Sequence, residues 1–275
     1  MKVSVIVTTY KDLVSLGFVL DGLQRQDYRD FEVVIAEDDN DIETVHFLKK
    51  YKKSLNIVHV SHQDIGRTKT VIQNKAVLAS SGEYLIFIDG DVIPYRNFIS
   101  SQIKIAKPRQ VLSGRRVNLN EKISRQIKEG KLDPLQIEKY YWFYALFFMF
   151  DKETRYEQGF YISPDSWIYK YFLEKRKRHT AILGCNWSCF KEDFIAINGF
   201  DEGYINTSVG EDTDLDWRFE MAGYSVKSSK NIANVLHLYH KQGDFPTAID
   251  TKEQLKKRKD KKLFICLKGI NNHSN

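Results

Sequence analysis

Apolar residues in the first 114 positions alternate between two spacings. Short runs rich in β-branched residues are typical of buried strands, and apolar residues that recur every three or four positions are typical of helices. Leu13, Leu16, Leu20 and Leu23 mark the first helix. The strand-like runs lie at 3–8, 31–36, 56–60, 84–88 and 111–112, and the helical runs at 13–23, 42–51, 68–79 and 98–106. This alternation predicts an α/β fold with a mostly parallel central sheet flanked by helices.

The later part of the chain is less regular. A helix is expected from Gly210 to Ala222, because Gly223 is a favourable C-terminal stop. One or two closing strands are expected within 226–240, and a basic helical tail over 252–268. The chain is therefore expected to divide into a first half at 1–114, a second half of the same domain at 115–250, and a tail at 251–275.

The net charge of +6 is concentrated in that tail, where 252–268 holds eight Lys or Arg and two Asp or Glu. A nucleic-acid binder would carry basic residues across a folded face, so no nucleic-acid partner is expected. The tail fits an anionic membrane surface or a solvated charged helix. The composition, with 42% hydrophobic and 28% charged residues, excludes a disordered chain.

Other sequence features bear on the compartment. The N-terminus enters a strand pattern without a leader, and the longest apolar run, at 140–150, is shorter than the roughly 20 residues that span a bilayer. We expect a cytoplasmic protein with a peripheral contact at the inner membrane face. The aromatic run at 140–150 favours core packing or a partner surface over an acceptor cleft. Cys185, Cys189 and Cys266 have neither disulfide nor zinc-site spacing, so buried free thiols are expected.

Polar side chains follow three of the predicted strands, at 8–10, 37–39 and 89–91. The carboxyl ends of parallel strands form the ligand-binding rim of such sheets. Asp89 and Asp91, one residue apart in a turn, suit a divalent cation that bridges diphosphate oxygens. A simple polar turn is the competing interpretation.

Two further clusters lie in the second half. Gly210-Glu211-Asp212-Thr213-Asp214 groups carboxylates at a helix start, which suits a general base or only complements the helix dipole. His237 and His240 are candidate metal ligands. On a strictly extended strand they would point to opposite faces, so only one would bind without a bend.

The order and spacing of these motifs resemble family 2 glycosyltransferases with the A-type nucleotide-sugar fold. The resemblance covers roughly residues 2–115 and is carried by 3–10, 31–38, Asn74 with Gly82-Glu83-Tyr84, and 88–91. In the second half, Ile197-Asn198-Gly199-Phe200 and the acidic cluster are similar to the acceptor-side segment of β-1,4-galactosyltransferases and of bacterial chondroitin-synthase-type domains.

The resemblance implies a donor site for a UDP-sugar. Thr8, Tyr10 and Asp38 would hold the uracil, Asp89 would bind on the ribose side, and Asn74 belongs to the donor-side segment. The customary Arg of that segment is missing, so Arg67, Lys69 or Lys75 would contact a phosphate instead.

The resemblance also implies the reacting groups. Asp91 and His240 would hold Mn²⁺ or Mg²⁺, with His237 as the alternative or second ligand. Asp212 would be the catalytic base and Glu211 would contact the acceptor hydroxyl. A sugar ring stacking on Trp187 would complete the acceptor site, with core packing as the equal alternative.

These roles describe a metal-dependent inverting transferase that moves a hexose or N-acetylhexosamine from a UDP-sugar to a glycan hydroxyl. The implied setting is surface polysaccharide synthesis (O-antigen or capsule), with an acceptor carried on a polyprenyl diphosphate. A protein or peptide acceptor and a non-catalytic sugar-nucleotide-binding module remain as alternatives. A nucleotidyltransferase is disfavoured, because no Gly-rich loop follows the first strand.

Overall fold

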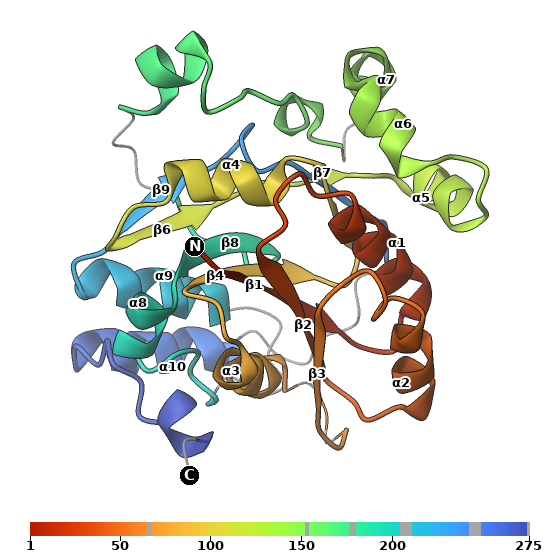
Figure 1. Ribbon diagram of the computed structural model, residues 1–275. Helices are drawn as coiled ribbons and strands as arrows, with labels where there is room; N and C mark the ends of the chain where they lie inside the picture. The colour runs from red at the N-terminus through yellow and green to blue at the C-terminus, as the bar shows by residue number, and fades with distance from the viewer. Residues whose placement is uncertain are drawn as a thin grey trace.

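The computed structural model describes residues 1–64, 66, 68–151, 154–175, 180–203, 211–241 and 249–273. Its centre is a seven-stranded sheet of order β3-β2-β1-β4-β8-β6-β9 (Figure 1). The strands are β1 (Val3–Thr9), β2 (Phe31–Glu37), β3 (Ile57–Ser61), β4 (Tyr84–Asp89), β6 (Gln110–Ser113), β8 (Asn186–Phe190) and β9 (Ser225–Ser228). Only β8 runs antiparallel to its neighbours in this sheet. The mostly parallel α/β sheet predicted from the sequence is confirmed.

Helices cover both faces of this sheet, which is why its strands are apolar on both sides. On β1, Val3, Val5 and Val7 pack into one core and Ile6 packs into the other. The first core is closed by α1 (Leu13–Gln24), α2 (Ile42–Lys49) and α4 (Phe98–Ile105). The second is closed by α3 (Lys69–Ala79), α8 (Lys191–Ala196) and α9 (Glu211–Met221).

A three-stranded sheet of order β5-β10-β7 links the two halves of the chain. Its strands are β5 (Val92–Pro94), β7 (Val117–Asn118) and β10 (Val235–His237). It packs on a lobe made of α5 (Glu121–Lys128), α6 (Pro134–Lys139), α7 (Tyr141–Phe148) and the short helix η1 (Tyr156–Gln158). Because β5 directly follows Asp91, pairing with β10 brings the strand end of the first half beside His237.

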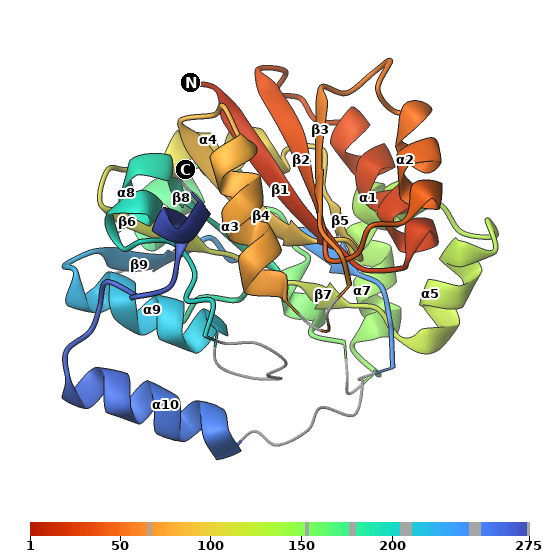
Figure 2. The same ribbon diagram turned by 90° about the horizontal axis from the view of Figure 1, so that it is seen from below.

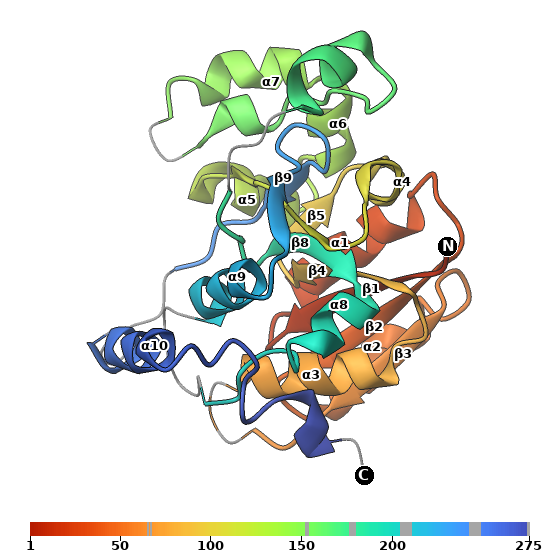
Figure 3. The same cartoon turned by 90° about the vertical axis from the view of Figure 1, so that its left-hand side faces the viewer.

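The tail packs back onto the second half (Figure 3). It consists of α10 (Ile249–Asp260), a loop, and the short helix η3 (Ile270–His273). The predicted helix over 252–268 is wrong in its later part, which leaves helical geometry after Asp260. Arg258 Nη2 lies 2.6 Å from Asp201 Oδ2, and Ile270 N donates to Asn198 O. A membrane contact by the tail stays a prediction.

Two other expectations concern the whole chain. Cys185, Cys189 and Cys266 are buried free thiols, as the sequence predicts. Within the described ranges, every helix is too short or too polar to cross a membrane.

Candidate active site

The carboxyl ends of β1 and β4 meet at one edge of the sheet (Figure 2). Thr8 pairs in register with Asp89, and Gly90 N donates to Thr8 O at 2.7 Å. The next strand, β2, is followed by Asp38, whose N–H donates to Thr9 O. A cavity of about 580 Å³ opens at this edge. It is lined by Thr8, Thr9, Tyr10, Asp12, Asp38, Gly66, Lys69, Asp89, Gly90, Asp91 and His240.

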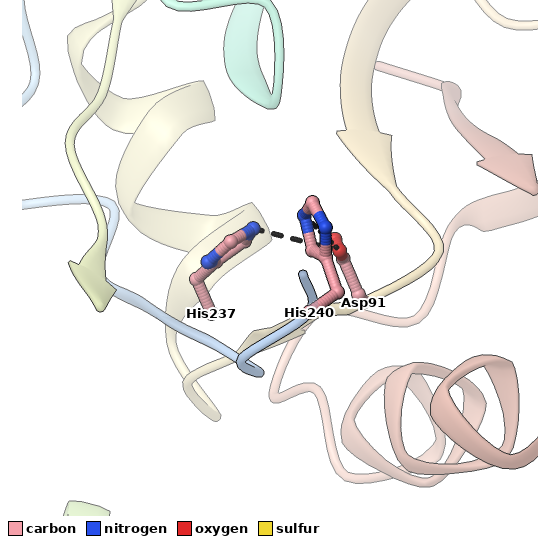
Figure 4. Close-up of side chains that lie close together, drawn as sticks. All are labelled: Asp91, His237 and His240. Carbon is pink, nitrogen blue, oxygen red and sulfur yellow. Dashed lines mark ion pairs between the residues drawn. The ribbon is translucent and has the colours of Figure 1, made fainter. Parts of the chain in front are cut away.

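Asp91 and both histidines converge at one side of the cavity (Figure 4). Asp91 Oδ2 lies 3.5 Å from His237 Nε2 and 3.3 Å from His240 Nε2. The opposite-face argument for an extended strand does not apply, because β10 ends at His237 and the chain bends before His240. Leu238 N donates to Asp91 O at 3.0 Å and fixes this bend against the β4–β5 turn.

This cluster fits a divalent metal ion. One ligand atom from each of Asp91, His237 and His240 lies within 4.8 Å of the others. Asp91 Oδ1 is buried, and no donor in the described part of the chain reaches it. Burial raises the pKa of Asp91, but the hydrogen bond to His237 and the charges of His237, His240 and Lys69 outweigh it and lower this pKa. The carboxylate is therefore held ionised, as a metal ligand must be.

Lys69 also lines the cavity, where its Nζ donates to Asp89 Oδ1 at 2.7 Å. Of the three predicted phosphate contacts it is the one that lines the cavity, and Arg67 lies outside the described residues. Tyr10 is 52% exposed and its hydroxyl donates to Asp64 Oδ2. Its ring is thus available at the cavity mouth for a flat ligand.

Asp38 is held from three sides. Its carboxylate accepts from His62 Nε2 at 2.7 Å, Thr68 Oγ1 at 2.6 Å and Thr68 N at 2.9 Å, and the residue is only 5% exposed. These contacts fix the carboxylate at the cavity wall before any ligand arrives. His62 could not be identified from the sequence, because a single histidine after a strand forms no recognisable motif.

Arg116 is a second basic group that the sequence reasoning missed. Burial lowers its pKa, but the thiol of Cys185 and the charges of Asp89 and Asp91 raise the pKa of Arg116 overall. Its Nη1 donates to Cys185 Sγ at 3.2 Å. The guanidinium therefore offsets the negative charge of the two aspartates from behind the cavity.

Asn74 and Trp187 have structural roles inside the protein. Asn74 is fully buried, donates to Phe200 O and Glu202 Oε1, and accepts from Phe200 N. Trp187 is 1% exposed and stacks on Phe87 with ring centroids 4.2 Å apart. Neither side chain lines the cavity. The buried contacts of Asn74 do not support its predicted donor contact, and the stacking of Trp187 on Phe87 favours core packing, the equal alternative given above.

The acidic residues at the start of α9 fall into two groups, one buried and one partly exposed. Asp214 is buried and pairs with Arg218, whose Nε lies 2.7 Å from Asp214 Oδ2. Glu211 and Asp212 are partly exposed in the first turn, and Asp212 packs beside Gly184. Figure 2 shows α9 beginning on the side of the molecule where β1 and β4 end. Gly210 lies outside the described residues.

The comparisons with known proteins agree with this geometry. Residues 4–177 match the family described as glycosyl transferase family 2, and residues 168–241 match the N-terminal domain of galactosyltransferase. The chain belongs to glycosyl transferase family 2, and it is an enzyme of the glycosyltransferase class.

Two curated relatives match about a third of the chain. The poly(ribitol-phosphate) β-N-acetylglucosaminyltransferase TarS of Staphylococcus aureus is 31% identical over 93 residues, which are 33% of this chain and 16% of TarS. The GalNAc(5)-diNAcBac-PP-undecaprenol β-1,3-glucosyltransferase of Campylobacter jejuni is 28% identical over 91 residues, 33% of this chain and 29% of that enzyme. The chain thus matches less than a third of either relative.

Two solved structures share the fold over most of the chain. TarS 1–349 with UDP-GlcNAc has a TM-score of 0.55 at 19% identity, covering 92% of this chain and 64% of that one. The mannosyltransferase PcManGT of Pyrobaculum calidifontis, in complex with GDP-Man and Mn²⁺, has a TM-score of 0.56 at 19% identity, covering 88% and 58%. These likenesses establish the A-type glycosyltransferase fold.

Proposed function

We propose that the protein is a metal-dependent inverting glycosyltransferase that uses a UDP-sugar. The observation that carries this proposal is the Asp91, His237 and His240 cluster beside a cavity at the carboxyl ends of β1 and β4. Mn²⁺ fits this cluster better than Mg²⁺, because two of the three side chains offer nitrogen and Mg²⁺ prefers oxygen ligands. A bound ion would neutralise charge on a diphosphate leaving group.

The donor would occupy the cavity with its base beside Asp38, Thr8 and Tyr10. The Asp38 carboxylate accepts a hydrogen bond from the uracil imide, and Tyr10 lies against the ring. Asp89 takes the ribose side. Lys69, now paired with Asp89 at 2.7 Å, reaches the diphosphate as a cation.

The acceptor would enter from the side of α9. Asp212 takes the proton from the attacking hydroxyl, and Glu211 holds that acceptor. One in-line displacement inverts the anomeric carbon, so an α-linked UDP-sugar gives a β-linked product. Under this proposal each segment of the chain has its own role. Residues 1–114 bind the donor, residues 115–250 bind the acceptor and supply the base, and residues 251–275 form the tail.

The transferred sugar would be a hexose or an N-acetylhexosamine, and the acceptor a glycan. The named activities of TarS and of the Campylobacter enzyme support this choice, since both add such a sugar and one acts on an undecaprenol-linked glycan. We propose a surface polysaccharide, O-antigen or capsule, built on a polyprenyl diphosphate at the inner face of the membrane. Transfer to a protein side chain is the second candidate.

A UDP-release assay tests the reaction. The purified protein is incubated with each UDP-sugar and Mn²⁺ or EDTA, as wild type and as Asp91→Asn. Metal-dependent UDP release that the variant loses supports the proposal and identifies the sugar. Absence of both UDP release and UDP binding by calorimetry would overturn it. A panel of glycan and peptide acceptors, read by product mass, separates the two acceptor classes.

A further inference from the structure

Helix α7 is apolar on its solvent face as well as on its core face. Tyr141, Ala145 and Phe148 point inward and pack on the three-stranded sheet. The outward positions of an ordinary surface helix carry polar residues. Those of this segment are Trp142, Phe143, Leu146, Phe147 and Phe150, exposed by 79%, 58%, 59%, 61% and 85%. We call these five residues the α7 face.

A second exposed aromatic group lies at the same end of the molecule. The segment that contains η2 (Tyr169–Leu173) exposes Trp167, Tyr171 and Phe172 by 64%, 72% and 63%. Figure 1 shows this green segment and α7 rising above α4 on the side away from α10. Monomeric proteins rarely leave so many large apolar side chains together in water, so this end of the molecule is built to be covered.

The charges around the α7 face point to the kind of partner. Lys122, Arg125, Lys139 and Lys170 are exposed, and among the described residues none of them forms an ion pair with an acidic group. Glu121 is exposed beside Lys122 on α5, whereas the other acidic side chains nearby are held by groups of the protein itself. Glu129 pairs with Lys131, Glu174 with Lys107, Glu157 with Lys230 and Asp165 with Lys104, while Asp151 accepts from Asn120 and Glu138 from Arg96 N. The exposed cations beside the aromatic residues are therefore available to contact anionic groups of a partner.

We propose that the α7 face inserts into the headgroup region of an anionic lipid bilayer. Exposed Trp and Phe beside unpaired Lys and Arg match the two layers of such a surface, apolar acyl chains below anionic headgroups. The eight residues of α7 are about 12 Å long at 1.5 Å per residue, far less than a bilayer. The helix therefore lies in the plane of the membrane and does not cross it. A protein partner would instead need acidic groups opposite Lys122, Arg125, Lys139 and Lys170.

This assignment competes with a membrane contact through the basic tail. Figure 1 shows α7 at the upper right and α10 at the lower left, so the two helices present separate parts of the surface. Among the described tail residues, Lys259 lies over the partly exposed ring of Trp217 and Arg258 is bound to Asp201, so both cations already have partners within the protein. Docking through α7 does not depend on the proposed transfer reaction, because lipid binding is measured without any donor.

Flotation with vesicles of phosphatidylcholine containing about a third phosphatidylglycerol tests the proposal. We expect Phe147→Ser with Phe150→Ser to weaken partitioning at least about tenfold, because two large apolar groups no longer insert. Lys122→Ser with Arg125→Ser should weaken binding to these vesicles and leave the weak binding to pure phosphatidylcholine unchanged. The matched control, Lys256→Ser with Lys261→Ser in the tail, should bind like wild type. Equal melting temperatures show that the variants fold.

Tryptophan fluorescence tests the contact between the α7 face and the lipid in the wild-type protein. Acyl-brominated lipids should quench the tryptophan fluorescence of the wild-type protein, and Trp142→Phe should remove a large share of that quenching. Trp217→Phe, on α9, should not. The proposal is overturned if wild type fails to float, if the tail variant alone loses binding, or if the α7 variants only convert an oligomer to a monomer by sedimentation. The last result would assign the α7 face to a second copy of the chain.

Discussion

Nε2 of His240 lies 3.3 Å from Oδ2 of Asp91, and the two residues come from opposite halves of the chain. Asp91 lies between β4 and β5 in the first half, and His240 follows β10 in the second. The pairing of β5 with β10 brings them together. The candidate metal centre therefore exists only when the two halves are folded against each other.

The first prediction separates the two histidines as ligands. His240→Gln and His237→Gln should each weaken Mn²⁺ binding at least about tenfold, because each removes one nitrogen from a three-residue cluster. Asp91→Asn should abolish it. Calorimetric titration of Mn²⁺ into protein saturated with UDP measures the effect. His46→Gln, an exposed histidine on α2, is the control and should bind like wild type. Unchanged affinity in both histidine variants would exclude this cluster as the metal centre.

The second prediction concerns Lys69. Its ammonium is 2.7 Å from Asp89 and lines the cavity, so Lys69→Met removes a cation and leaves an unpaired carboxylate beside the donor phosphates. A charge-assisted hydrogen bond of this kind stabilises by about 1.5–3 kcal/mol, so KM for the UDP-sugar should rise about tenfold or more. Steady-state kinetics measure this, with the exposed Lys52→Met as the control. A lower kcat at unchanged KM would assign Lys69 another role.

The third prediction separates proton transfer from donor binding. Asp212→Asn should lower kcat about 10²–10⁴-fold, the usual contribution of a general base. Calorimetric affinity for UDP should not change, because Asp212 does not line the donor cavity. Asp260→Asn, an exposed aspartate on α10, should retain full activity. Full activity of Asp212→Asn would assign the base to another carboxylate, with Glu211 the next to test.

The sequence predicted those parts of the fold that repeat along the chain. The residues of β1, β2, β4 and α1 form long runs in which apolar residues follow the spacing of a strand or a helix. The spacing of these apolar positions is enough to identify the four elements. It did not predict β5 and β7 as strands, because two or three residues carry no period. It also could not predict that β8 inserts antiparallel between β4 and β6, since strand order depends on contacts distant in sequence.

Residues of the candidate site could be predicted from the sequence where the residue type has few possible roles. Asp89, Asp91 and His240 line one cavity, and His237 lies 3.5 Å from Asp91, because carboxylates and imidazoles at strand ends meet at one edge of the sheet. Asn74 was misassigned, since an amide serves equally well to bind a ligand or to join Phe200 and Glu202 inside the protein. Trp187 kept two equal interpretations for the same reason, because an aromatic ring stacks on Phe87 as readily as on a sugar.

The fourth prediction is a pH dependence of stability. Glu32 is 3% exposed and accepts from Ser4 Oγ, Ser81 N and Ser81 Oγ at 2.6–2.7 Å. Burial raises its pKa, but these hydrogen bonds outweigh burial and lower the pKa of Glu32 below its usual 4.5. The ionised form therefore stabilises the folded state above about pH 4.5, and this contribution is lost as pH falls through the lowered value.

Glu32→Gln should accordingly destabilise the protein by about 2 kcal/mol near pH 7, and the difference from wild type should shrink below pH 4. Thermal unfolding at a series of pH values measures both parts. Glu220→Gln, an exposed glutamate on α9, should give a constant and small difference. A Glu32→Gln difference that stays constant down to pH 3 would contradict the lowered pKa.

The fifth prediction concerns the tail as a structural clamp. Arg258 of α10 lies 2.6 Å from Asp201 and 3.6 Å from the buried Asp214. Removing Arg258 leaves Asp201 buried without its cation, while Asp214 keeps Arg218, and an unpaired buried carboxylate costs more than the pair itself stabilises. Arg258→Ala should therefore destabilise the folded state by about 2–4 kcal/mol near pH 7, whereas Lys256→Ala on the same helix should change stability by less than about 0.5 kcal/mol.

The pH dependence identifies the cause of that loss. Burial raises the pKa of Asp201, and Arg258 partly offsets this. Without Arg258 the pKa of Asp201 rises further, so acid protonates the unpaired carboxyl and removes its cost. Because the pKa of Asp201 is raised in the folded state, the variant should approach wild-type stability as pH falls through that raised pKa, measured by thermal unfolding. A loss independent of pH would mean that Arg258 acts through packing, and no loss would mean that the tail does not clamp Asp201.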